Sequence, residues 1–418
     1  MRSSHTIGIR GIILGCVLTS IAVPAWAANW AQSYLNAGRT GYNAKEQTLS
    51  TGNVSGLQLI WGQSVAGGVT GFALDNGTIY AQGQGSTTPN LVAIDAATGA
   101  IKWTITTGND GLYLSGTVAV VGGLVVAGCG FTDLNGDNYG GICAYKKSNG
   151  AQVWQFSGPC NCLPEASVAA PLVVSGNKVY FGYNNGSTSH SYIRAIDAKT
   201  GNTSWFYVPA YGLYTDPPVV GNGMVYFACN NQQSFAAVCA LAQSDGSFAW
   251  MSANFGISTD LGLSLAKSVL YINAAAANEF AAIDATTGAP KWTVAGNSGS
   301  EPIAIAKNVL YARGSDGYVY ALSAKTGASV WSENLNAPDA SVSIANGVLY
   351  VDQDYHAPAA IAAFDASDGT PLWSSSGAGA TIFPPPIIAN GILYDTNDTG
   401  CGIVCAYGLP GARRQPVN

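Results

Sequence analysis

Charged residues are scarce in this chain: they make up 10% of its 418 residues, and the formal net charge is −6. So few charges beside 48% hydrophobic residues exclude a solvated disordered chain and a coiled coil. Nucleic acids and anionic membranes are bound by clusters of Lys and Arg, and no cluster occurs before the Arg413–Arg414 pair. The sequence therefore excludes nucleic-acid binding.

Long hydrophobic runs are also missing, since no stretch reaches the roughly 18 apolar residues that a membrane-spanning helix needs. Arg2 and Arg10 precede a shorter apolar run from Gly11 to Pro24, which is followed by the small-x-small sequence Ala25-Trp26-Ala27. This pattern predicts an export signal over residues 1–27, and hence a secreted or periplasmic protein without a transmembrane segment. Because the signal contains two of the arginines, the mature chain would carry 15 basic and 23 acidic residues, a net charge of −8.

Common catalytic motifs are absent as well. The chain has no C-x-x-C-H haem site, no G-x-S-x-G nucleophile elbow and no phosphate-binding glycine loop. Behind the signal only His190 and His356 remain, which poorly supply a histidine-based metal centre or triad. We expect His356 to be an ordinary surface-loop histidine.

Cysteine is better supplied, and its usage favours disulfides. Cys16 ends a sequence that faintly resembles a lipoprotein box, but only five residues separate it from Arg10, so lipidation is the weaker alternative. An even number of cysteines in an exported chain favours disulfides. Zinc is the weaker interpretation because the close pairs are C-x-C and C-x3-C instead of C-x2-C. The cysteines behind the signal are Cys129, Cys143, Cys160, Cys162, Cys229, Cys239, Cys401 and Cys405.

A repeat dominates the rest of the sequence. Seven segments align without gaps, among them A-I-D-A-A-T-G-A-I-K-W at residues 93–103, and their tryptophans are 39 to 51 residues apart. Each segment predicts a strand, a tight turn at a glycine that takes positive φ, and a second strand ending in tryptophan. An apolar strand–turn–strand precedes each segment, as in residues 217–227. One repeat therefore has the length and pattern of a four-stranded propeller blade.

The two ends of the chain contain complementary halves of one further blade. Residues 56–61 form a tryptophan strand with no blade before it, whereas Ile392–Tyr394 and Cys405–Gly408 are strands with no tryptophan strand after them. Joined, they close the ring and remove its sheet edge, which a two-sheet sandwich or a solenoid would not explain. The sequence predicts an all-β, eight-bladed β-propeller of four-stranded antiparallel blades, with the last blade closed by the N- and C-terminal strands.

Two cysteine pairs occupy matching places in blades two and four. Cys129 and Cys143 lie in the second and third strands of one blade, and Cys229 and Cys239 in those of the other. Neighbouring antiparallel strands place Cα atoms about 4.5–5.5 Å apart, so we predict a disulfide in each pair. The other four cysteines stay unassigned; the last two cannot be joined within one extended strand, but could be across a turn.

The loop between Cys129 and Cys143 has a calcium-like spacing. Asp133, Asn135 and Asp137 place oxygen ligands at positions 1, 3 and 5 of a loop, a spacing that converges side chains on Ca²⁺. No acid follows at position 9 or 12, so the affinity would be modest. A plain Asn/Asp/Gly turn is an equal alternative.

The A-x-D-x-x-T-G-x-x-x-W repeat resembles that of the pyrroloquinoline-quinone (PQQ) type propellers, from about Trp30 to Gly408. The segment W-A-Q-S-Y-L-N-A-G-R-T-G-Y-N, followed by N-V-S-G-L-Q-L-I-W, is similar to the lead-in of quinoprotein alcohol dehydrogenases. We divide the mature chain into a lead-in over 28–53, the propeller over 54–408 and a tail over 409–418. The resemblance implies that each repeat tryptophan docks between neighbouring blades, these being Trp61, Trp103, Trp154, Trp205, Trp250, Trp292, Trp331 and Trp373.

Acidic residues gather where a propeller ligand would meet the top of the central channel. When the inner strands are aligned, four consecutive blades place an acid near the strand start: Asp216, Asp260, Glu301 and Asp339, with Thr70 at the matching position in blade one. Converging carboxylates could bind a cation such as Ca²⁺ or hold a basic or polyhydroxylated ligand. Alternatively, they are solvated turn residues that cap the strand starts.

The enzymatic site implied by the resemblance does not carry over securely. Such dehydrogenases use a vicinal Cys-Cys disulfide, a calcium held by Glu and Asn, a catalytic Asp, and an insertion that shields the quinone. This chain has no adjacent cysteines and no long insertion, and Cys160-Asn161-Cys162 and Glu165 are only loose matches.

We therefore expect a monomeric, exported binding or scaffold module, whose top face takes a protein partner or a small polar ligand. The repeat itself is shared by quinone-dependent dehydrogenases and by non-catalytic scaffolds such as the propeller lipoprotein of the outer-membrane assembly machinery. The alternatives are a small PQQ- and Ca-dependent dehydrogenase acting on an alcohol or sugar, and a polysaccharide-acting enzyme.

Overall fold

A computed structural model describes most of the chain behind the predicted export signal. The described residues are 29–66, 68–83, 90–107, 118–132, 138–156, 172–185, 190–210, 217–231, 235–256, 261–335, 341–352, 360–377, 384–396, 398 and 401–411. The predicted signal lies outside them. No helix in these ranges is long and apolar enough to span a membrane, and the two helices there are the 3₁₀ turns η1 (Val54–Gly56) and η2 (Ala275–Ala277).

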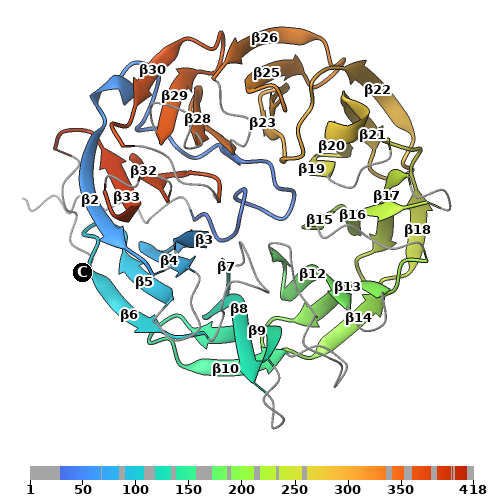
Figure 1. The fold of residues 1–418 in the computed structure, drawn as a ribbon, viewed down its shortest axis with the longest axis horizontal. Helices are drawn as coiled ribbons and strands as arrows, with labels where there is room; N and C mark the ends of the chain where they lie inside the picture. The colour runs from blue at the N-terminus through green and yellow to red at the C-terminus, as the bar shows by residue number, and fades with distance from the viewer. Residues whose placement is uncertain are drawn as a thin grey trace, which may run out of the picture.

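Eight antiparallel sheets surround a central axis and form an eight-bladed β-propeller, as the sequence predicted (Figure 1). Each blade has four strands, and strands that follow one another in the chain are hydrogen-bonded neighbours, except where the two chain ends meet. Innermost strand first, blades one to four contain β3 (Val69–Asp75), β4 (Thr78–Gly83), β5 (Leu91–Asp95) and β6 (Ile101–Ile105); β7 (Val118–Val121), β8 (Leu124–Thr132), β9 (Asn138–Lys146) and β10 (Gln152–Phe156); β11 (Val173–Ser175), β12 (Lys178–Asn185), β13 (His190–Asp197) and β14 (Thr203–Tyr207); and β15 (Val219–Gly221), β16 (Met224–Asn230), β17 (Ala236–Ala242) and β18 (Phe248–Met251). Blades five to eight contain β19 (Leu261–Ala266), β20 (Val269–Ala274), β21 (Glu279–Asp284) and β22 (Pro290–Ala295); β23 (Ala304–Ala306), β24 (Val309–Arg313), β25 (Tyr318–Ser323) and β26 (Ser329–Asn334); β27 (Val342–Ala345), β28 (Val348–Asp352), β29 (Ile361–Asp365) and β30 (Pro371–Ser374); and β31 (Ile387–Ala389), β32 (Ile392–Asp395), β33 (Ile403–Gly408) and β2 (Gln58–Ser64).

Blade eight is built from both ends of the chain. The N-terminal strand β2 pairs with β33 in antiparallel register, with Trp61 opposite Ala406, and β33 pairs in turn with β32. The largest hydrophobic cluster joins buried residues between Trp30 and Ala96 to others between Ala345 and Tyr407. This pairing gives β33 a partner on its outer side and ties the two chain ends together.

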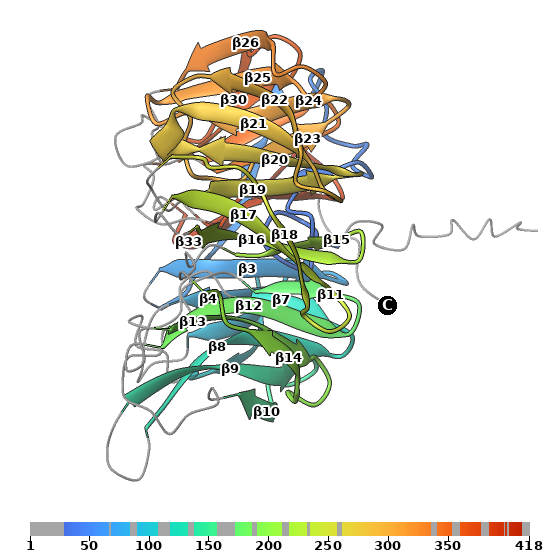
Figure 2. The ribbon, with the colours of Figure 1, turned by 90° about the vertical axis from the view of Figure 1, so that its right-hand side faces the viewer.

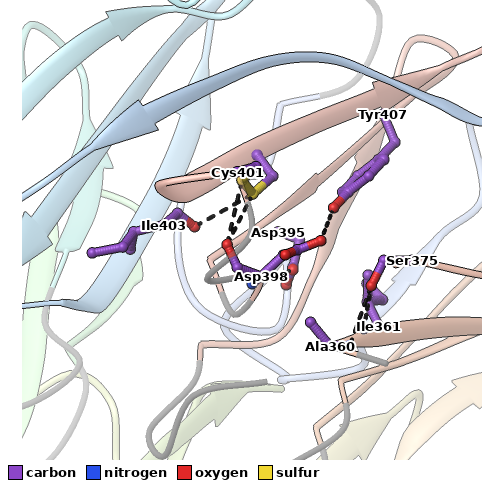
Figure 3. The surroundings of a disulfide bond; sticks show 9 residues. Ala360, Ile361, Ser375, Asp395, Asp398, Cys401, Ile403 and Tyr407 are labelled. Carbon is purple, nitrogen blue, oxygen red and sulfur yellow. Dashed lines mark hydrogen bonds between the residues drawn. A yellow bond between two sulfur atoms is a disulfide. The ribbon is translucent and has the colours of Figure 1, made fainter. Parts of the chain in front are cut away.

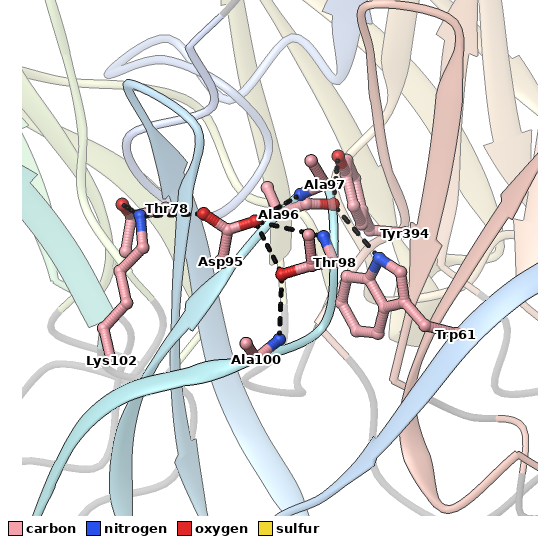
Figure 4. A network of polar contacts seen from close by, with 9 residues as sticks. All are labelled: Trp61, Thr78, Asp95, Ala96, Ala97, Thr98, Ala100, Lys102 and Tyr394. Atoms are coloured by element: carbon pink, nitrogen blue, oxygen red, sulfur yellow. Dashed lines mark hydrogen bonds and ion pairs between the residues drawn. The ribbon is translucent and has the colours of Figure 1, made fainter. Parts of the chain in front are cut away.

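The Asp, Gly and Trp of the repeat have separate roles, and Figure 4 shows the Asp95 turn of blade one with Trp61 beside it. Asp95 Oδ1 accepts hydrogen bonds from Ala97 N (3.2 Å), Thr98 N (3.0 Å) and Thr98 Oγ1 (2.9 Å), which hold the turn. Gly99 has a φ of +74°, and a Cβ there would lie 2.8 Å from the ring of Trp61. Trp61 of blade eight donates its indole N–H to Ala96 O of blade one at 3.2 Å. The repeat thus folds its own turn and receives the neighbouring blade.

The same contact recurs around the ring. Seven repeat tryptophans donate to a main-chain carbonyl of the next blade over 2.8–3.2 Å, the acceptors being Ala96, Lys147, Ala198, Gln243, Ala324, Ala366 and Leu57. The bond from Trp373 to Leu57 joins blade seven to blade eight across the chain ends. Trp250 is the exception, because its buried indole N–H has no acceptor within the described residues.

Residues 30–43, which precede β2, cross all eight blades (Figures 1 and 2). We call this segment the strap. Following the order of the blades, the strap forms hydrogen bonds with the same position of each innermost strand. This position lies next to the turn between the first and second strands of the blade. The bonded residues are Leu74, Val120, Val174, Val220, Leu265, Ile305, Ile344 and Ile388. Six of these contacts use strap main-chain atoms, and two use the side-chain amides of Gln32 and Asn43. The strap ends in β1 (Tyr42–Asn43), which pairs in parallel with β27 and adds a fifth strand to blade seven.

Three disulfides lie within the described residues. The predicted pairs Cys129–Cys143 and Cys229–Cys239 are bonded, each with a Cα–Cα distance of 5.8 Å across neighbouring strands. Cys401 is bonded to Cys405, with a Cα–Cα distance of 5.9 Å. A turn makes this short bridge feasible, because Gly402 and Ile403 between the cysteines have φ values of +109° and +121°. Cys160 and Cys162 lie outside the described residues.

Candidate functional site

The strap places a tyrosine against the starts of two inner strands. Tyr34 is 2% exposed, and its hydroxyl donates to Glu301 Oε2 at 2.8 Å and lies 3.4 Å from Ser341 Oγ. Glu301 precedes β23 and Ser341 precedes β27, whereas the strap itself bonds the far ends of these two strands. Tyr34 therefore reaches from the strap toward the ends of β23 and β27 at which the chain enters blades six and seven.

Charge and burial keep the Tyr34 hydroxyl protonated. Burial first, and then the Glu301 carboxylate, raise the pKa of Tyr34 well above its ordinary value. The Arg39 guanidinium lies 4.9 Å from the centroid of the Tyr34 ring and acts in the opposite direction. Since the phenol stays neutral, it serves as a donor to the carboxylate, and one oxygen of Glu301 is engaged inside the protein.

The predicted acidic mouth is only partly within the described residues. Glu301 is the one acid of the four that the structure describes, because Asp216, Asp260 and Asp339 lie outside those ranges. Thr70 is buried, and its hydroxyl donates to Gln82 O at 3.2 Å within blade one. Convergence of the four acids thus stays a prediction.

The other candidate ligands also fall outside the described part of the chain. These are the calcium-like residues Asp133, Asn135 and Asp137, together with Glu165 and His356. Among the described residues, no group of three or more His, Cys, Asp or Glu side chains is arranged to hold a metal ion. Within the described residues the mouth offers one carboxylate, already bonded to a phenol, against the six to eight oxygen ligands of Ca²⁺, so we derive no chemistry through calcium or a quinone here.

A second acidic cluster, which the sequence analysis missed, lies between blades seven and eight, and Figure 3 shows its members Asp395, Asp398 and Tyr407. Asp352 ends β28 and Asp395 ends β32; both are 0% exposed, and Asp398, just beyond β32, is 3% exposed. Tyr407 of β33 donates its hydroxyl to Asp398 Oδ2, and Asp398 N donates to Asp395 Oδ2 at 3.1 Å. We call Asp352, Asp395, Asp398 and Tyr407 the junction cluster.

Burial dominates the electrostatics of the junction cluster. Burial first, and then the charge of Asp395, raise the pKa of Asp352 well above the usual range of an aspartate. Burial, followed by the hydrogen bond to Asp398, raises the pKa of Tyr407. The sequence carried a weak signal, namely an aspartate at the end of an otherwise apolar second strand. It did not reveal that two such strand ends face one another.

A family model described as "Outer membrane protein assembly factor BamB" matches residues 45–294, 189–345 and 281–392. The chain belongs to this family of PQQ-type repeat propellers. The match covers blades one to seven together with β2 and β31 of blade eight, in agreement with the resemblance seen in the repeat. No match was found among curated proteins.

Solved structures with the same fold include members with quite different names. Quinohemoprotein alcohol dehydrogenase from Comamonas testosteroni aligns with a TM-score of 0.71 at 15% identity, covering 94% of this chain and 82% of that one. The enzyme ADHIIG from Pseudomonas putida HK5 aligns with 0.72 at 14% identity and the same coverage. BamB from Moraxella catarrhalis aligns with 0.56 at 16% identity, covering 86% of this chain and 99% of that one. At these identities the likeness concerns the fold, which BamB-type and quinoprotein propellers share.

Proposed function

We propose that this protein is an exported, non-catalytic binding or scaffold module that receives a protein partner on the face opposite the strap. Membership of the BamB family supports a scaffold role. Three disulfides and the signal predicted over residues 1–27 support export to an oxidising compartment.

The observation that carries this proposal is the bond between Tyr34 and Glu301. The strap occupies the ends of all eight inner strands, and Tyr34 engages the one described acid of the predicted mouth. Tyr34 and Glu301 take up space on the channel side of the inner strands, which disfavours a cofactor there and favours a macromolecular partner that binds the rim.

The rival is a PQQ- and calcium-dependent dehydrogenase acting on an alcohol or sugar. The shared fold with quinohemoprotein alcohol dehydrogenases favours it. To separate the two, the protein is incubated with PQQ and Ca²⁺ and desalted, and retained quinone and dye-linked oxidation of a panel of alcohols and sugars are measured. We expect neither retention nor turnover, in wild type and Glu301→Gln alike. Quinone retention with turnover would overturn the proposal in favour of the dehydrogenase.

Crosslinking from two positions at opposite ends of blade four tests which face of the propeller binds the partner. A photo-crosslinking residue replaces either Asn254, which follows β18, or Ser244, which lies in the turn between β17 and β18; both positions are exposed and at opposite ends of the blade. In the exporting cell we expect one recurrent protein adduct from position 254 and none from position 244. Adducts from position 244 alone would place the partner on the strap face and contradict the assignment.

A further inference from the structure

One position of the second strand carries a buried amide that bonds the next blade. In blade one, Gln82 Nε2 donates to Gly128 O at 2.7 Å, and Gln82 Oε1 accepts from Gly128 N at 3.2 Å. In blade five, Asn273 Nδ2 donates to Arg313 O at 3.1 Å. In both blades the amide residue lies two residues after a second-strand tyrosine, Tyr80 or Tyr271, that pairs with an alanine of the third strand. Gly128 and Arg313 occupy the corresponding position in the second strands of blades two and six. A hydrogen-bond donor at this position thus joins neighbouring blades.

Blade seven has a carboxyl group where the other two blades have an amide. Asp352 follows Tyr350 by two residues, and Tyr350 is paired with Ala363 as its counterparts are. Asp352 is fully buried, and neither of its carboxyl oxygens receives a hydrogen bond from a donor group of the described residues. The side chain that faces it is Asp395 of blade eight, which is itself fully buried. Two carboxylates repel each other, whereas a carboxylic acid can donate to a carboxylate.

We propose that Asp352 and Asp395 share one proton at neutral pH, and that this proton joins blade seven to blade eight. Asp352 is the donor, since Asp395 Oδ2 already accepts from Asp398 N and is thereby suited to the ionised form. The protonated acid then joins neighbouring blades as Gln82 and Asn273 do, but its acceptor is the side chain of Asp395, one residue after Tyr394, instead of a main-chain carbonyl. Ring closure consequently becomes sensitive to pH.

Within the described part of the chain, no group around the pair offers a countercharge to Asp352. The titratable side chains of the described elements packed there are Asp398, Tyr407 and Tyr350, and no ion pair of the described residues includes Asp352. Burial and the neighbouring Asp395 charge act in the same direction, raising the pKa of Asp352. Paired buried carboxyl groups that hold one proton are a known arrangement in proteins.

The sign of the pH effect follows from linkage. A carboxyl group with a raised pKa in the folded state contributes its full stability below the ordinary aspartate pKa, and loses it as the pH rises through the folded-state value. Within this window the folded protein holds one proton more than the unfolded chain. The unfolding equilibrium constant therefore rises up to about tenfold per pH unit and then levels off.

The test measures denaturant unfolding from about pH 5 to about pH 9, a range in which ordinary aspartates are already ionised. We expect this destabilisation with rising pH in wild type, and a flat profile in Asp352→Asn, whose amide donates at every pH. The control is Asp368→Asn in an exposed turn of the same blade; because its pKa is lowered, Asp368 is ionised throughout and its loss should leave the slope unchanged. A protonated-carboxyl C=O stretch in the infrared spectrum should be present in wild type and absent in Asp352→Asn.

Several results would overturn the proposal. A flat wild-type profile, or a slope that persists in Asp352→Asn, means that no proton is bound there. If Ca²⁺ at alkaline pH stabilises wild type but not Asp352→Asn, and the infrared band is missing, the pair binds a cation instead of a proton. Should Asp352→Asn fail to fold, Asp395→Asn with the same two measurements decides the question.

Discussion

At the scale of the residue, the turn glycines satisfy two demands at once. Each has a positive φ, and seven of them lie against the tryptophan of the preceding blade so closely that a Cβ would come within 3.0 Å of the ring. The positive φ is a local property, whereas the ring contact belongs to the assembled propeller. The seven glycines are Gly99, Gly150, Gly201, Gly246, Gly288, Gly327 and Gly369.

Replacing one of them therefore costs more than a turn. Gly327 has a φ of +73°, and its Cβ would lie 2.7 Å from Trp292 Cε3. We expect Gly327→Ala to lower the free energy of unfolding by about 2–4 kcal/mol, through backbone strain and displacement of the indole, as measured by urea titration. The control Gly123→Ala lies in an exposed turn with open space at its Cβ and should change stability by less than about 0.5 kcal/mol. Equal losses at both positions would contradict the tryptophan contact.

At the scale of the element, the strap has no regular secondary structure over most of its length and is held in place by its contacts with the blades. It forms hydrogen bonds with every blade, and its first residue Trp30 is 1% exposed inside the largest hydrophobic cluster. The Trp30 indole N–H has no partner within the described residues, so this side chain stabilises the fold by packing. The strap is thus an integral part of the propeller core.

Truncating Trp30 should show this. We expect Trp30→Ala to lower the free energy of unfolding by about 3–5 kcal/mol, the usual cost of a large cavity, and Trp30→Phe to recover most of the loss. Gln47→Ala, an exposed position just beyond the strap, is the control and should be neutral. If Trp30→Ala unfolds at the wild-type denaturant concentration, the strap does not contribute to the core.

At the scale of the whole molecule, closure of blade eight decides whether the ring holds. The chain ends meet through the pairing of β2 with β33 and through Trp373, which donates to Leu57 O at 3.1 Å. Blades seven and eight meet additionally at the junction cluster. A ring with one unpaired blade exposes a sheet edge and the apolar faces on either side of it.

Removing β2 should consequently unfold the entire domain. We expect deletion of residues 54–64 to abolish the cooperative thermal transition and the native tryptophan fluorescence, since the last blade loses its outer strand. A peptide with the deleted sequence, added during refolding, should restore part of the transition because the missing pairing is supplied in trans. A soluble, fully folded deletion variant would contradict ring closure by the two chain ends.

Cation binding also belongs to the scale of the whole molecule, because two separate regions, the predicted acidic mouth and the loop of blade two, are candidate calcium sites. If converging acids line the mouth, or if the loop of blade two binds calcium, millimolar Ca²⁺ should raise the melting temperature by about 2–5 °C. Replacing Asp216 and Glu301 with Asn and Gln should remove the rise if the mouth is responsible. Replacing Asp133 and Asp137 should remove it if the loop is. If neither double replacement changes the calcium-induced rise in melting temperature, both groups of acidic residues are solvated turn residues.

The sequence by itself determined the architecture. The Gly and Trp of each repeat, with an Asp in four of the seven, act within about ten residues or on the next blade, so their spacing was enough to predict eight blades and the closure by complementary ends. The strand pattern then placed Cys129 beside Cys143 and Cys229 beside Cys239. Local turn geometry and hydrophobic period carry this information because they repeat. Polar contacts such as those of Tyr34 and Asp352 each occur once in the chain, so no repeated pattern predicted them.

The tertiary structure alone decided which polar groups meet. Tyr34 and Glu301 are 267 residues apart, and their bond exists because the strap crosses the ring instead of leaving it. Asp352 and Asp395 become neighbours because the ends of β28 and β32 face each other across a blade junction, where water is excluded. Burial changes the chemistry of these groups far more than their sequence context does, since the cost of a charge depends on the solvent and partners that only the folded ring provides.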